Sequence, residues 1–566
     1  MCPKTDLHPH RPTQRQAALQ HDFRRPNQTR AKAIYRAPAI RPEIVGNVLS
    51  NSWDLRGRGR ALGSGLLFYH IVLYPFYLSP LRHLPSPKQP PLHRRLLGEA
   101  SYEKLIQWIN EIPNDGLIRY YGFLNAERVL VTTPQGCKDV LQTQGYNYIK
   151  LPWALEVMGQ FAPRGILVAP PQMHKIDRKL LQPAFKFKYI KSLYPTFWAE
   201  GAKFLNIIEK ELRETENGTI NIGERLHHVT LDIITLTSFG ASIDAVENPA
   251  STRVKHFRNL FATKKDHLIY RRNAFLLPYF IYRRLPVKAR HEIMTARDVI
   301  ADFIRPLIQQ RRRDAKEATS KQYTQGDIIA TLLQSGETFS DDYLIDQSMD
   351  FMVAGQETTA TAVTFALYSL SENPEFQSRL RKEVREKLPS PSTNAEVDAG
   401  LVESLPYLTA VCNEVLRLFS PVVYCHRQTT APNTMIGPVP IPQDTVVTVA
   451  PGVIHESRQV WGPQAGEFDP ERWLARKDGE VKVDPLGGTN DPWAVMPFTY
   501  GPRQCIGERF ARGEMMSLVA QLVGRFEWKF KGIGRNGDRP MKIVHTVVAG
   551  PAGGNVTMYA HPIGGW

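Results

Sequence analysis

Polar and apolar positions divide the chain into four stretches. Residues 1–60 are polar with little periodicity, whereas residues 61–79 form an apolar run in which only His70 is readily ionisable. About 20 apolar residues suffice to span a bilayer. The run therefore predicts a single transmembrane helix, with a buried core helix as the alternative. Residues 80–101 are rich in proline and predict a stiff linker. Residues 102–566 have the pattern of a globular domain.

The globular part predicts a mainly α fold with a small β part. Residues Leu117–Thr133 alternate around Gly122 and Asn125, which predicts a β-hairpin. From about Pro134 to Arg385 the periodicity is largely helical. Further along we expect a short helix beyond Glu403, short strands within Val422–Val449, a Pro/Gly-rich stretch to about Gly501, a final helix from near Cys505, and two strands with a turn at Gly550–Asn555.

One predicted helix, DYLIDQSMDFMVAGQETTATAVTFALYSL, is apolar on nearly every face. Ser340 can cap it, Asp341 and Asp342 suit the positive end of its dipole, and Asn373-Pro374 ends it. A helix of this kind is expected to cross the interior of the domain. The polar residues at its midpoint, in the segment 354–359, therefore require a separate explanation.

Charge is concentrated in the N-terminal stretch. The formal net charge is +16, and residues 1–60 carry twelve Lys/Arg against four Asp/Glu. This composition predicts a basic, disordered extension. No zinc, RNP or helix-turn-helix pattern accompanies it, so no nucleic-acid partner is expected.

The five cysteines show no paired spacing, which argues against a disulfide framework and favours a reducing compartment. Cys505 stands in Phe498-Thr-Tyr-Gly501-Pro-Arg503-Gln-Cys505-Ile-Gly507, just before the final helix. The start of a helix is expected to lower the pKa of a thiol. The two glycines let the backbone approach something flat and large. A thiolate in such a setting is a known ligand of haem iron. The alternative is a buried structural cysteine.

The segment around Cys505 resembles the haem-binding loop of the cytochrome P450 family, FxxGxRxCxG, at every defined position. Ala354-Gly-Gln-Glu357-Thr358-Thr resembles the oxygen-activation groove of the same family, [AG]Gx[DE]T[TS]. The resemblance covers about residues 80–560, with the motifs in the family's order. It implies the cytochrome P450 fold, preceded here by the transmembrane helix.

The resemblance assigns roles to individual residues. Cys505 would be the axial ligand of the iron in haem b, with Phe498 packed beside the thiolate and Gly507 close to the haem. Thr358 and Glu357 would manage proton delivery during O2 activation, although a threonine in a helix often merely bonds back to the helix carbonyls. Haem propionates would pair with Arg503, with Arg178 and His174 in a helix where the family usually has Trp at the His position, and with Arg427. Glu414, Arg417 and Arg472 would form a structural cluster beside the haem loop.

The resemblance also implies candidate substrate-facing residues, a substrate class and an electron-transfer partner. Candidate substrate-facing residues are Phe351, Met352, Ala354, Val422, Val423, Tyr424, Val547 and Val548. Their apolar character favours a lipophilic substrate of the terpenoid, sterol, alkaloid or fatty-acid type, and the general architecture of the N-terminal linker resembles that of fungal enzymes of secondary metabolism. No GxGxxG fingerprint is present. Electrons are therefore expected from NADPH through a separate NADPH-cytochrome P450 reductase.

The anchor implies contact with membrane lipid and a single-pass location in the endoplasmic reticulum membrane, with the catalytic domain in the cytoplasm. Two rival functions remain open. One is a haem-thiolate isomerase or dehydratase that needs no external electrons, and the other is a non-catalytic haem-binding membrane protein. Relatives of the first kind usually alter the central threonine, whereas Thr358 is intact.

Overall fold

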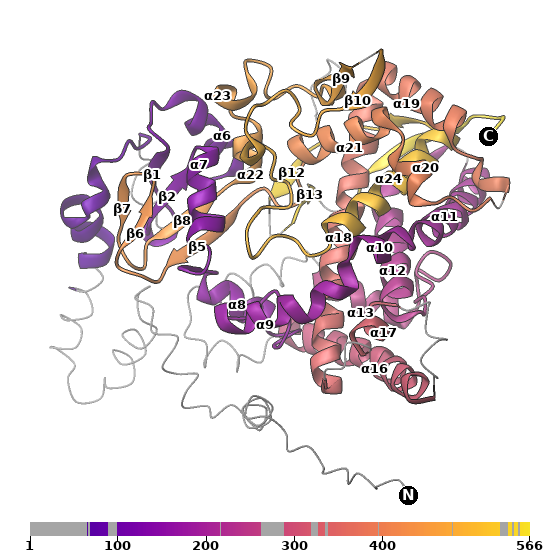
Figure 1. The fold of residues 1–566 in the computed structure, drawn as a ribbon, viewed down its shortest axis with the longest axis horizontal. Coiled ribbons are helices and arrows are strands. Elements are labelled where there is room, and N and C mark those ends of the chain that lie inside the picture. The colour runs from indigo at the N-terminus through magenta and orange to yellow at the C-terminus, as the bar shows by residue number, and fades with distance from the viewer. Residues whose placement is uncertain are drawn as a thin grey trace, which may run out of the picture. The chain divides into compact units, whose positions relative to one another are not determined.

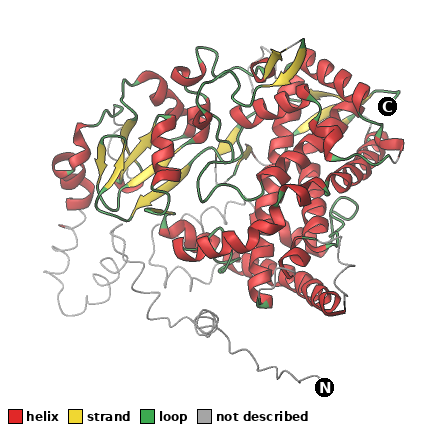
Figure 2. Cartoon of the chain, viewed as in Figure 1, coloured by secondary structure: helices red, strands yellow, loops and turns green. Residues whose placement is uncertain are grey.

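The computed structural model describes a helix-rich body with several small sheets (Figures 1 and 2). The described residues are 65, 68–88, 99–215, 217–261, 288–317, 327–333, 338–393, 395–477, 479–532, 541–545, 548–552 and 555–566. They all belong to one compact unit of the chain, residues 65–566. The basic extension predicted at residues 1–60 and the candidate Val547 lie outside them.

The main sheet has five strands in the order β1-β2-β8-β5-β3. Its first two strands form the predicted hairpin, with Leu117 opposite Val131. Strand β2 pairs in parallel with β8, and the other pairs are antiparallel. The strands are β1 (Leu117–Tyr121), β2 (Glu127–Val131), β3 (Tyr148–Ile149), β5 (Cys425–Thr429) and β8 (Val446–Val449).

The remaining strands form smaller sheets. A three-stranded sheet has the order β11-β14-β4, and three hairpins are separate. Two strands were expected after the last helix, but the residues described there form four, and Gly550 lies within β13 opposite Val544 instead of in a turn. These strands are β4 (Thr219–Asn221), β6 (Thr434–Ile436), β7 (Val439–Ile441), β9 (Leu474–Lys477), β10 (Glu480–Val483), β11 (Phe526–Phe530), β12 (Ile543–His545), β13 (Ala549–Pro551) and β14 (Thr557–Pro562).

The helical part is built around the long helix predicted from the sequence, α18 (Asp341–Glu372). The Ser340 hydroxyl caps it by accepting the Tyr343 N–H at 3.1 Å, and Asn373 ends it before Pro374 begins the next helix. It packs on α12, α16, α21 and α24. The other helices are α6 (Tyr102–Glu111), α7 (Pro134–Lys138), α8 (Pro152–Met158), α9 (Pro171–Leu181), α10 (Phe187–Lys191), α11 (Tyr194–Glu214), α12 (Ile222–Phe239), α13 (Thr252–Phe261), α16 (Lys288–Glu317), α17 (Ile328–Leu333), α19 (Pro374–Lys387), α20 (Ala399–Glu403), α21 (Pro406–Leu418), α22 (Pro451–His455), α23 (Arg458–Trp461) and α24 (Glu508–Arg525).

Two large apolar cores result, one among the helices and one around the five-stranded sheet. The segment that carries Cys505 joins them. Met496 and Tyr500 pack on the sheet core, whereas Phe498 and Ile506 pack on the helical core. The cysteine therefore lies where the two cores meet.

The predicted membrane segment is described in part. Residues 69–78 form a π-helix, η1 (Tyr69–Leu78), that contacts the sheet. The Asn125 side chain donates to the Ile71 carbonyl at 2.5 Å, and Arg119 and the Tyr121 hydroxyl donate to the Pro75 carbonyl. Within the described ranges, no helix combines the length and the apolar character needed to cross a membrane.

The proline-rich segment that follows begins as a short 3₁₀ helix, η2 (Pro80–His83). Leu81 and Leu84 are buried in the sheet core, and the Pro85 carbonyl accepts the Arg119 N–H at 2.9 Å. Residues 80–85 of the predicted linker are therefore packed on the body, with a short 3₁₀ turn at Pro80–His83.

Candidate functional site

The Cys505 loop is shaped by its own backbone. The Cys505 N–H donates to the Phe498 carbonyl at 3.1 Å, and the Gln504 N–H donates to the Gly501 carbonyl at 3.0 Å. Gly501 has φ +82°, and a Cβ there would lie 2.1 Å from the Leu141 carbonyl oxygen, so only glycine fits. A Cβ at Gly507 would meet nothing closer than Phe185 at 4.0 Å. The protein around Gly507 thus leaves room on that side of the loop.

Cys505 is the exposed one among the cysteines that the structure describes. Cys505 keeps this exposed surface although many protein atoms surround its sulfur, and the resulting desolvation raises the pKa of the thiol to about 11. A hydrogen bond from the Gly507 N–H opposes this increase only in part. The sequence led us to expect a lowered pKa from the start of α24. The expectation is wrong because desolvation outweighs the helix terminus. Only a coordinated metal is expected to hold this sulfur as a thiolate at neutral pH.

Four cations gather near the loop without a carboxylate in ion-pair contact among the described residues. Their hydrogen bonds go to backbone carbonyls instead. Arg178 of α9 donates to Gln504 at 2.5 Å, Arg503 to Ala169 at 3.2 and 3.3 Å, Arg427 of β5 to His426 at 3.0 Å, and Lys150 to Leu167 at 2.6 Å.

The electrostatics of this cluster favour binding of an anion. Burial, then Arg427 and Arg503, lower the pKa of Lys150 to about 7. Burial, then Arg427, lower the pKa of Arg503 to about 10, and its Nε is buried without an acceptor. Uncompensated buried charge is costly. Two propionates would supply the missing negative charge, so the residues present fit a haem bound by Cys505.

His174, which lies on α9 one turn before Arg178, is a further member of the cluster near the Cys505 loop. Burial, then Arg503, Lys150 and Arg178, lower its pKa to about 3, so its ring is neutral. The Tyr146 hydroxyl lies 3.3 Å from His174 Nδ1. The neutral ring therefore suits hydrogen bonding to a propionate rather than an ion pair.

The middle of α18 has the second predicted feature. Ala354 is exposed, and Gly355, Glu357 and Thr358 are half-exposed, although the helix on either side is buried. This stretch therefore borders an open space. The Thr358 hydroxyl donates to the Ala354 carbonyl at 2.6 Å. The lone pairs of the hydroxyl oxygen remain available to accept a hydrogen bond from a donor in this space.

Gly355 has a different role from the expected one. We expected it to let the helix open, but α18 is continuous through it. A Cβ at Gly355 would lie 3.0 Å from the Ile234 side chain of α12. The glycine thus allows close packing of two helices.

The predicted charged cluster is present and buried. Glu414 accepts two hydrogen bonds from Arg417, at 2.7 and 2.8 Å, and one from Arg472 at 3.0 Å. The Trp473 indole also donates to Glu414, at 2.9 Å. Sequence reasoning missed Trp473, although its place beside Arg472 offered a signal.

A histidine joins this cluster to the cysteine loop. The Met496 N–H donates to His455 Nε2 at 3.0 Å, so the other ring nitrogen carries the proton and donates to the Arg417 carbonyl at 2.9 Å. Arg417 also donates to the His455 carbonyl at 2.6 Å. Burial, then Arg417, lower the pKa of His455 to about 3, which keeps this arrangement at all ordinary pH values. No motif signalled His455 or Lys150.

The candidate substrate-facing residues divide into two groups. Ala354, Val422 and Val548 retain exposed surface, and the Ala549 N–H donates to the Pro421 carbonyl at 2.7 Å, which brings the last two segments together. Phe351, Met352 and Val423 are buried, and Phe351 packs edge-on against Phe185. Tyr424 is half-buried beside the His426 ring.

Comparisons with known proteins agree with this geometry. The cytochrome P450 family model matches residues 116–557. The chain is 33% identical over 513 residues to cytochrome P450 monooxygenase sphH of Aspergillus fumigatus, covering 88% of this chain and 92% of the relative. It is 34% identical over 479 residues to cytochrome P450 monooxygenase FSL4 of Gibberella zeae (81% and 84%), and 33% identical over 515 residues to cytochrome P450 monooxygenase ALT8 of Alternaria alternata (81% and 86%). The chain thus belongs to the cytochrome P450 family and is a cytochrome P450 monooxygenase.

Proposed function

We propose that the enzyme inserts one oxygen atom of O2 into a lipophilic small molecule of secondary metabolism, using haem b and electrons from NADPH through a separate reductase. The observation that carries the proposal is the Cys505 loop, near which Arg178, Arg427, Arg503 and Lys150 make no ion-pair contact with a carboxylate among the described residues. When bound, the haem supplies the O2-activating chemistry.

Each group of residues has a part in this proposal. Cys505 ligates the iron, and Arg178, Arg427, Arg503 and Lys150 neutralise the propionates. Thr358, aided by Glu357, accepts and donates protons at its hydroxyl beside the open space in α18. The exposed apolar surface of Ala354, Val422 and Val548 supports a lipophilic substrate.

The proposal is tested by the reduced carbon-monoxide difference spectrum of the purified full chain. Wild type is expected to show the Soret band of a thiolate-ligated haem, and Cys505→Ala is expected to lose it. An unchanged spectrum in the variant would contradict the assignment. Product formation that requires both NADPH and an added reductase would separate a monooxygenase from an isomerase or dehydratase.

We also propose that the chain is a single-pass protein of the endoplasmic reticulum membrane with a cytoplasmic catalytic part. Support comes from the apolar run at residues 61–79 and from the exposed side chains of Phe68, Tyr77 and Leu78. A chain lacking residues 1–79 is expected to leave the membrane fraction. Equal membrane retention of both forms would contradict this location.

A further inference from the structure

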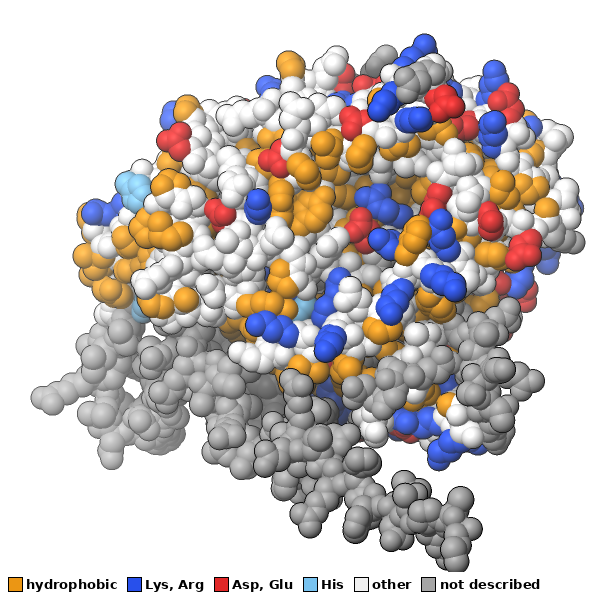
Figure 3. Space-filling view, viewed as in Figure 1, with side chains coloured by type: hydrophobic (Ala, Val, Ile, Leu, Met, Phe, Trp, Pro, Cys, Tyr) orange, Lys and Arg blue, Asp and Glu red, His pale blue; other side chains and the backbone are white. Residues whose placement is uncertain are grey.

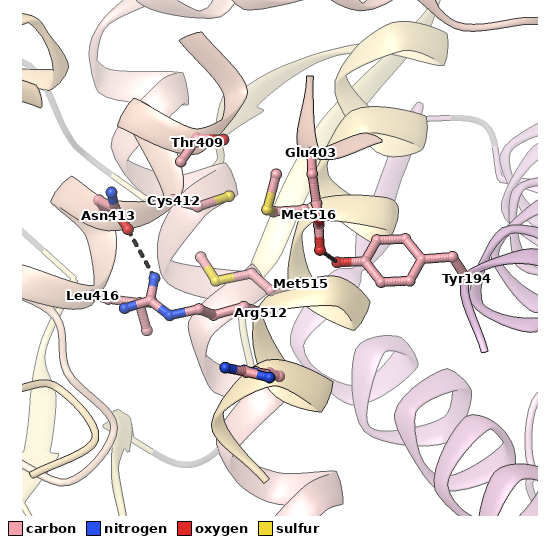
Figure 4. A pocket seen from close by; sticks show the side chains of 10 residues that line it. Tyr194, Glu403, Thr409, Cys412, Asn413, Leu416, Arg512, Met515 and Met516 are labelled. Carbon is pink, nitrogen blue, oxygen red and sulfur yellow. Dashed lines mark hydrogen bonds between the residues drawn. The ribbon is translucent and has the colours of Figure 1, made fainter. Parts of the chain in front are cut away.

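A pocket lies on a part of the body that the proposed catalytic groups do not occupy. Its walls come from α20, α21, α24 and the start of α11, and it encloses about 200 Å³. Figure 4 shows Cys412, Met515 and Met516 directed toward the space between α21 and α24. Neither Cys505 nor the groove of α18 lines it.

The floor of the pocket is apolar and adaptable. Cys412, Leu416, Met515 and Met516 line it, and each has less than a tenth of its surface exposed. Methionine side chains are flexible and polarizable, so they adjust to ligands of irregular shape. The floor therefore suits a small hydrocarbon group.

The rim is basic. Arg509 is exposed and stacks over the Phe187 ring at 4.7 Å, and among the described residues it has no carboxylate partner. The one acid that lines the pocket, Glu403, already accepts from the Tyr194 hydroxyl at 2.8 Å and pairs with Lys191 at 3.5 Å. Figure 3 shows basic side chains gathered over α10 and α24. The rim thus offers unpaired positive charge above an apolar floor.

We propose that this pocket binds a small amphipathic anion, a short-chain carboxylate whose head pairs with Arg509 and whose tail lies on the methionine floor. A guanidinium binds a carboxylate through two parallel hydrogen bonds. Pockets for drug-sized ligands usually span about 300–1,000 Å³, so a pocket of about 200 Å³ selects a smaller ligand.

A ligand in this pocket is expected to change contacts that reach the cysteine loop. Arg512 lines the pocket, donates to Asn413 at 2.8 Å and to Glu508 at 3.2 Å, and stacks over the Phe498 ring at 5.0 Å. Phe498 in turn accepts the Cys505 N–H. A carboxylate beside Arg509 and Arg512 would compete with these contacts, which makes the ligand an effector of the thiolate side.

The test is calorimetric titration of the full-length holoenzyme with octanoate and, separately, with neutral octanol. Octanoate is expected to bind, and Arg509→Gln is expected to weaken it about tenfold or more, because a charge-assisted pair is lost. Arg509→Lys should restore part of the affinity. Arg213→Gln, at an arginine that is 80% exposed and distant in sequence, should change nothing.

Other outcomes overturn the proposal. Equal affinity of octanoate for wild type and Arg509→Gln, with a Soret shift in both, would place the ligand at the haem instead. No octanoate binding, together with weaker reductase binding by Arg509→Gln, would assign the face to the electron donor. The carbon-monoxide spectrum is independent of this titration, so failure here leaves the proposed function standing.

Discussion

At the scale of residues, the site depends on cations that have no carboxylate in ion-pair contact within the described part of the chain; Asp350 raises the pKa of Lys150 without forming such a contact. Burial, then Arg427 and Arg503, lower the pKa of Lys150, and burial, then Arg427, lower that of Arg503. The hydrogen bonds of these cations go to backbone carbonyls. Desolvation by the surrounding protein likewise disfavours the thiolate form of Cys505. Both features have one explanation, a ligand that brings a metal cation to the sulfur and anions to the arginines and lysine.

Thr358→Ala tests the proton-handling residue. The hydroxyl is the polar group that α18 presents beside exposed Ala354, so its loss should divert electrons from product to peroxide. We expect a several-fold lower ratio of product to NADPH consumed, measured with peroxide release in the reconstituted system. Thr364→Ala, at a buried threonine of the same helix that also bonds back to a carbonyl, is the matched control. Unchanged coupling in Thr358→Ala would remove the residue from the mechanism.

At the scale of elements, polar side chains fix loops to helices around the site. Three residues of α18 hold the loop between α8 and α9. Asp346 accepts the Arg164 N–H at 3.1 Å, Gln347 accepts the Ile166 N–H at 3.1 Å, and Asp350 accepts the Leu167 N–H at 2.8 Å. On the other side His455 links α21 and α22 to the cysteine loop.

Asp350 is expected to make this loop sensitive to pH. Burial raises its pKa to about 7, with Asp346 and Asp177 adding to the increase and the Leu167 N–H and Lys150 opposing it. The folded state then binds the proton more tightly than the unfolded state. Its contribution to the free energy of unfolding is therefore complete below about pH 4 and is lost as pH rises to about 7.

Melting temperatures of wild type and Asp350→Asn across this range check the prediction. The amide keeps an acceptor for the Leu167 N–H but does not titrate, so only wild type should show this loss between about pH 4 and pH 7. Asp342→Asn, at a more exposed acid of the same helix, should follow wild type. Parallel curves for wild type and Asp350→Asn would contradict the pKa shift.

His455 is predicted to position the cysteine loop. His455→Ala removes both the acceptor for the Met496 N–H and the donor to the Arg417 carbonyl. A larger share of the protein should then lose the thiolate-type carbon-monoxide band while retaining haem. His455→Gln, which can supply a donor and an acceptor, should recover part of it. Loss of folding and spectrum together in both variants would indicate a general structural role instead.

At the scale of the whole molecule, the site lies where the sheet core and the helical core meet. The four cations come from a segment after β3, from α9, from β5 and from the cysteine loop, and Met496 and Phe498 pack on different cores. A ligand that neutralises these cations therefore stabilises the contact between the two cores.

Haem removal tests this stabilisation. The haem-free protein should melt at a lower temperature than the holoenzyme, because like charges are left unpaired between the cores. Lys150→Met should reduce the difference in melting temperature between the holoenzyme and the haem-free protein, since one charge of the cluster is gone. Lys188→Met, at an exposed lysine of α10, should leave this difference unchanged. Differential scanning calorimetry of both forms measures the difference. An equal difference in Lys150→Met and wild type would exclude Lys150 from the cluster.

The features that the sequence alone determined are local ones. Cys505, Arg503, Gly501 and Phe498 lie within a few residues of one another, so backbone geometry brings them together wherever the loop is placed. The cap at Ser340 and the stop before Pro374 define α18 for the same reason, since capping depends on neighbours within one turn.

Only the tertiary structure decided the rest. Because α18 is apolar on nearly every face, its periodicity did not show that Ala354 borders open space while Met352 is buried. Packing against α12 and α24 sets the rotation of α18 about its axis and so decides which residues are buried. Lys150 and His455 are single residues without a motif, and their roles arise from distant segments that folding brings into contact. The pKa of Cys505 also depended on the fold, because desolvation by the surrounding protein outweighs the effect of the helix terminus that the sequence predicted.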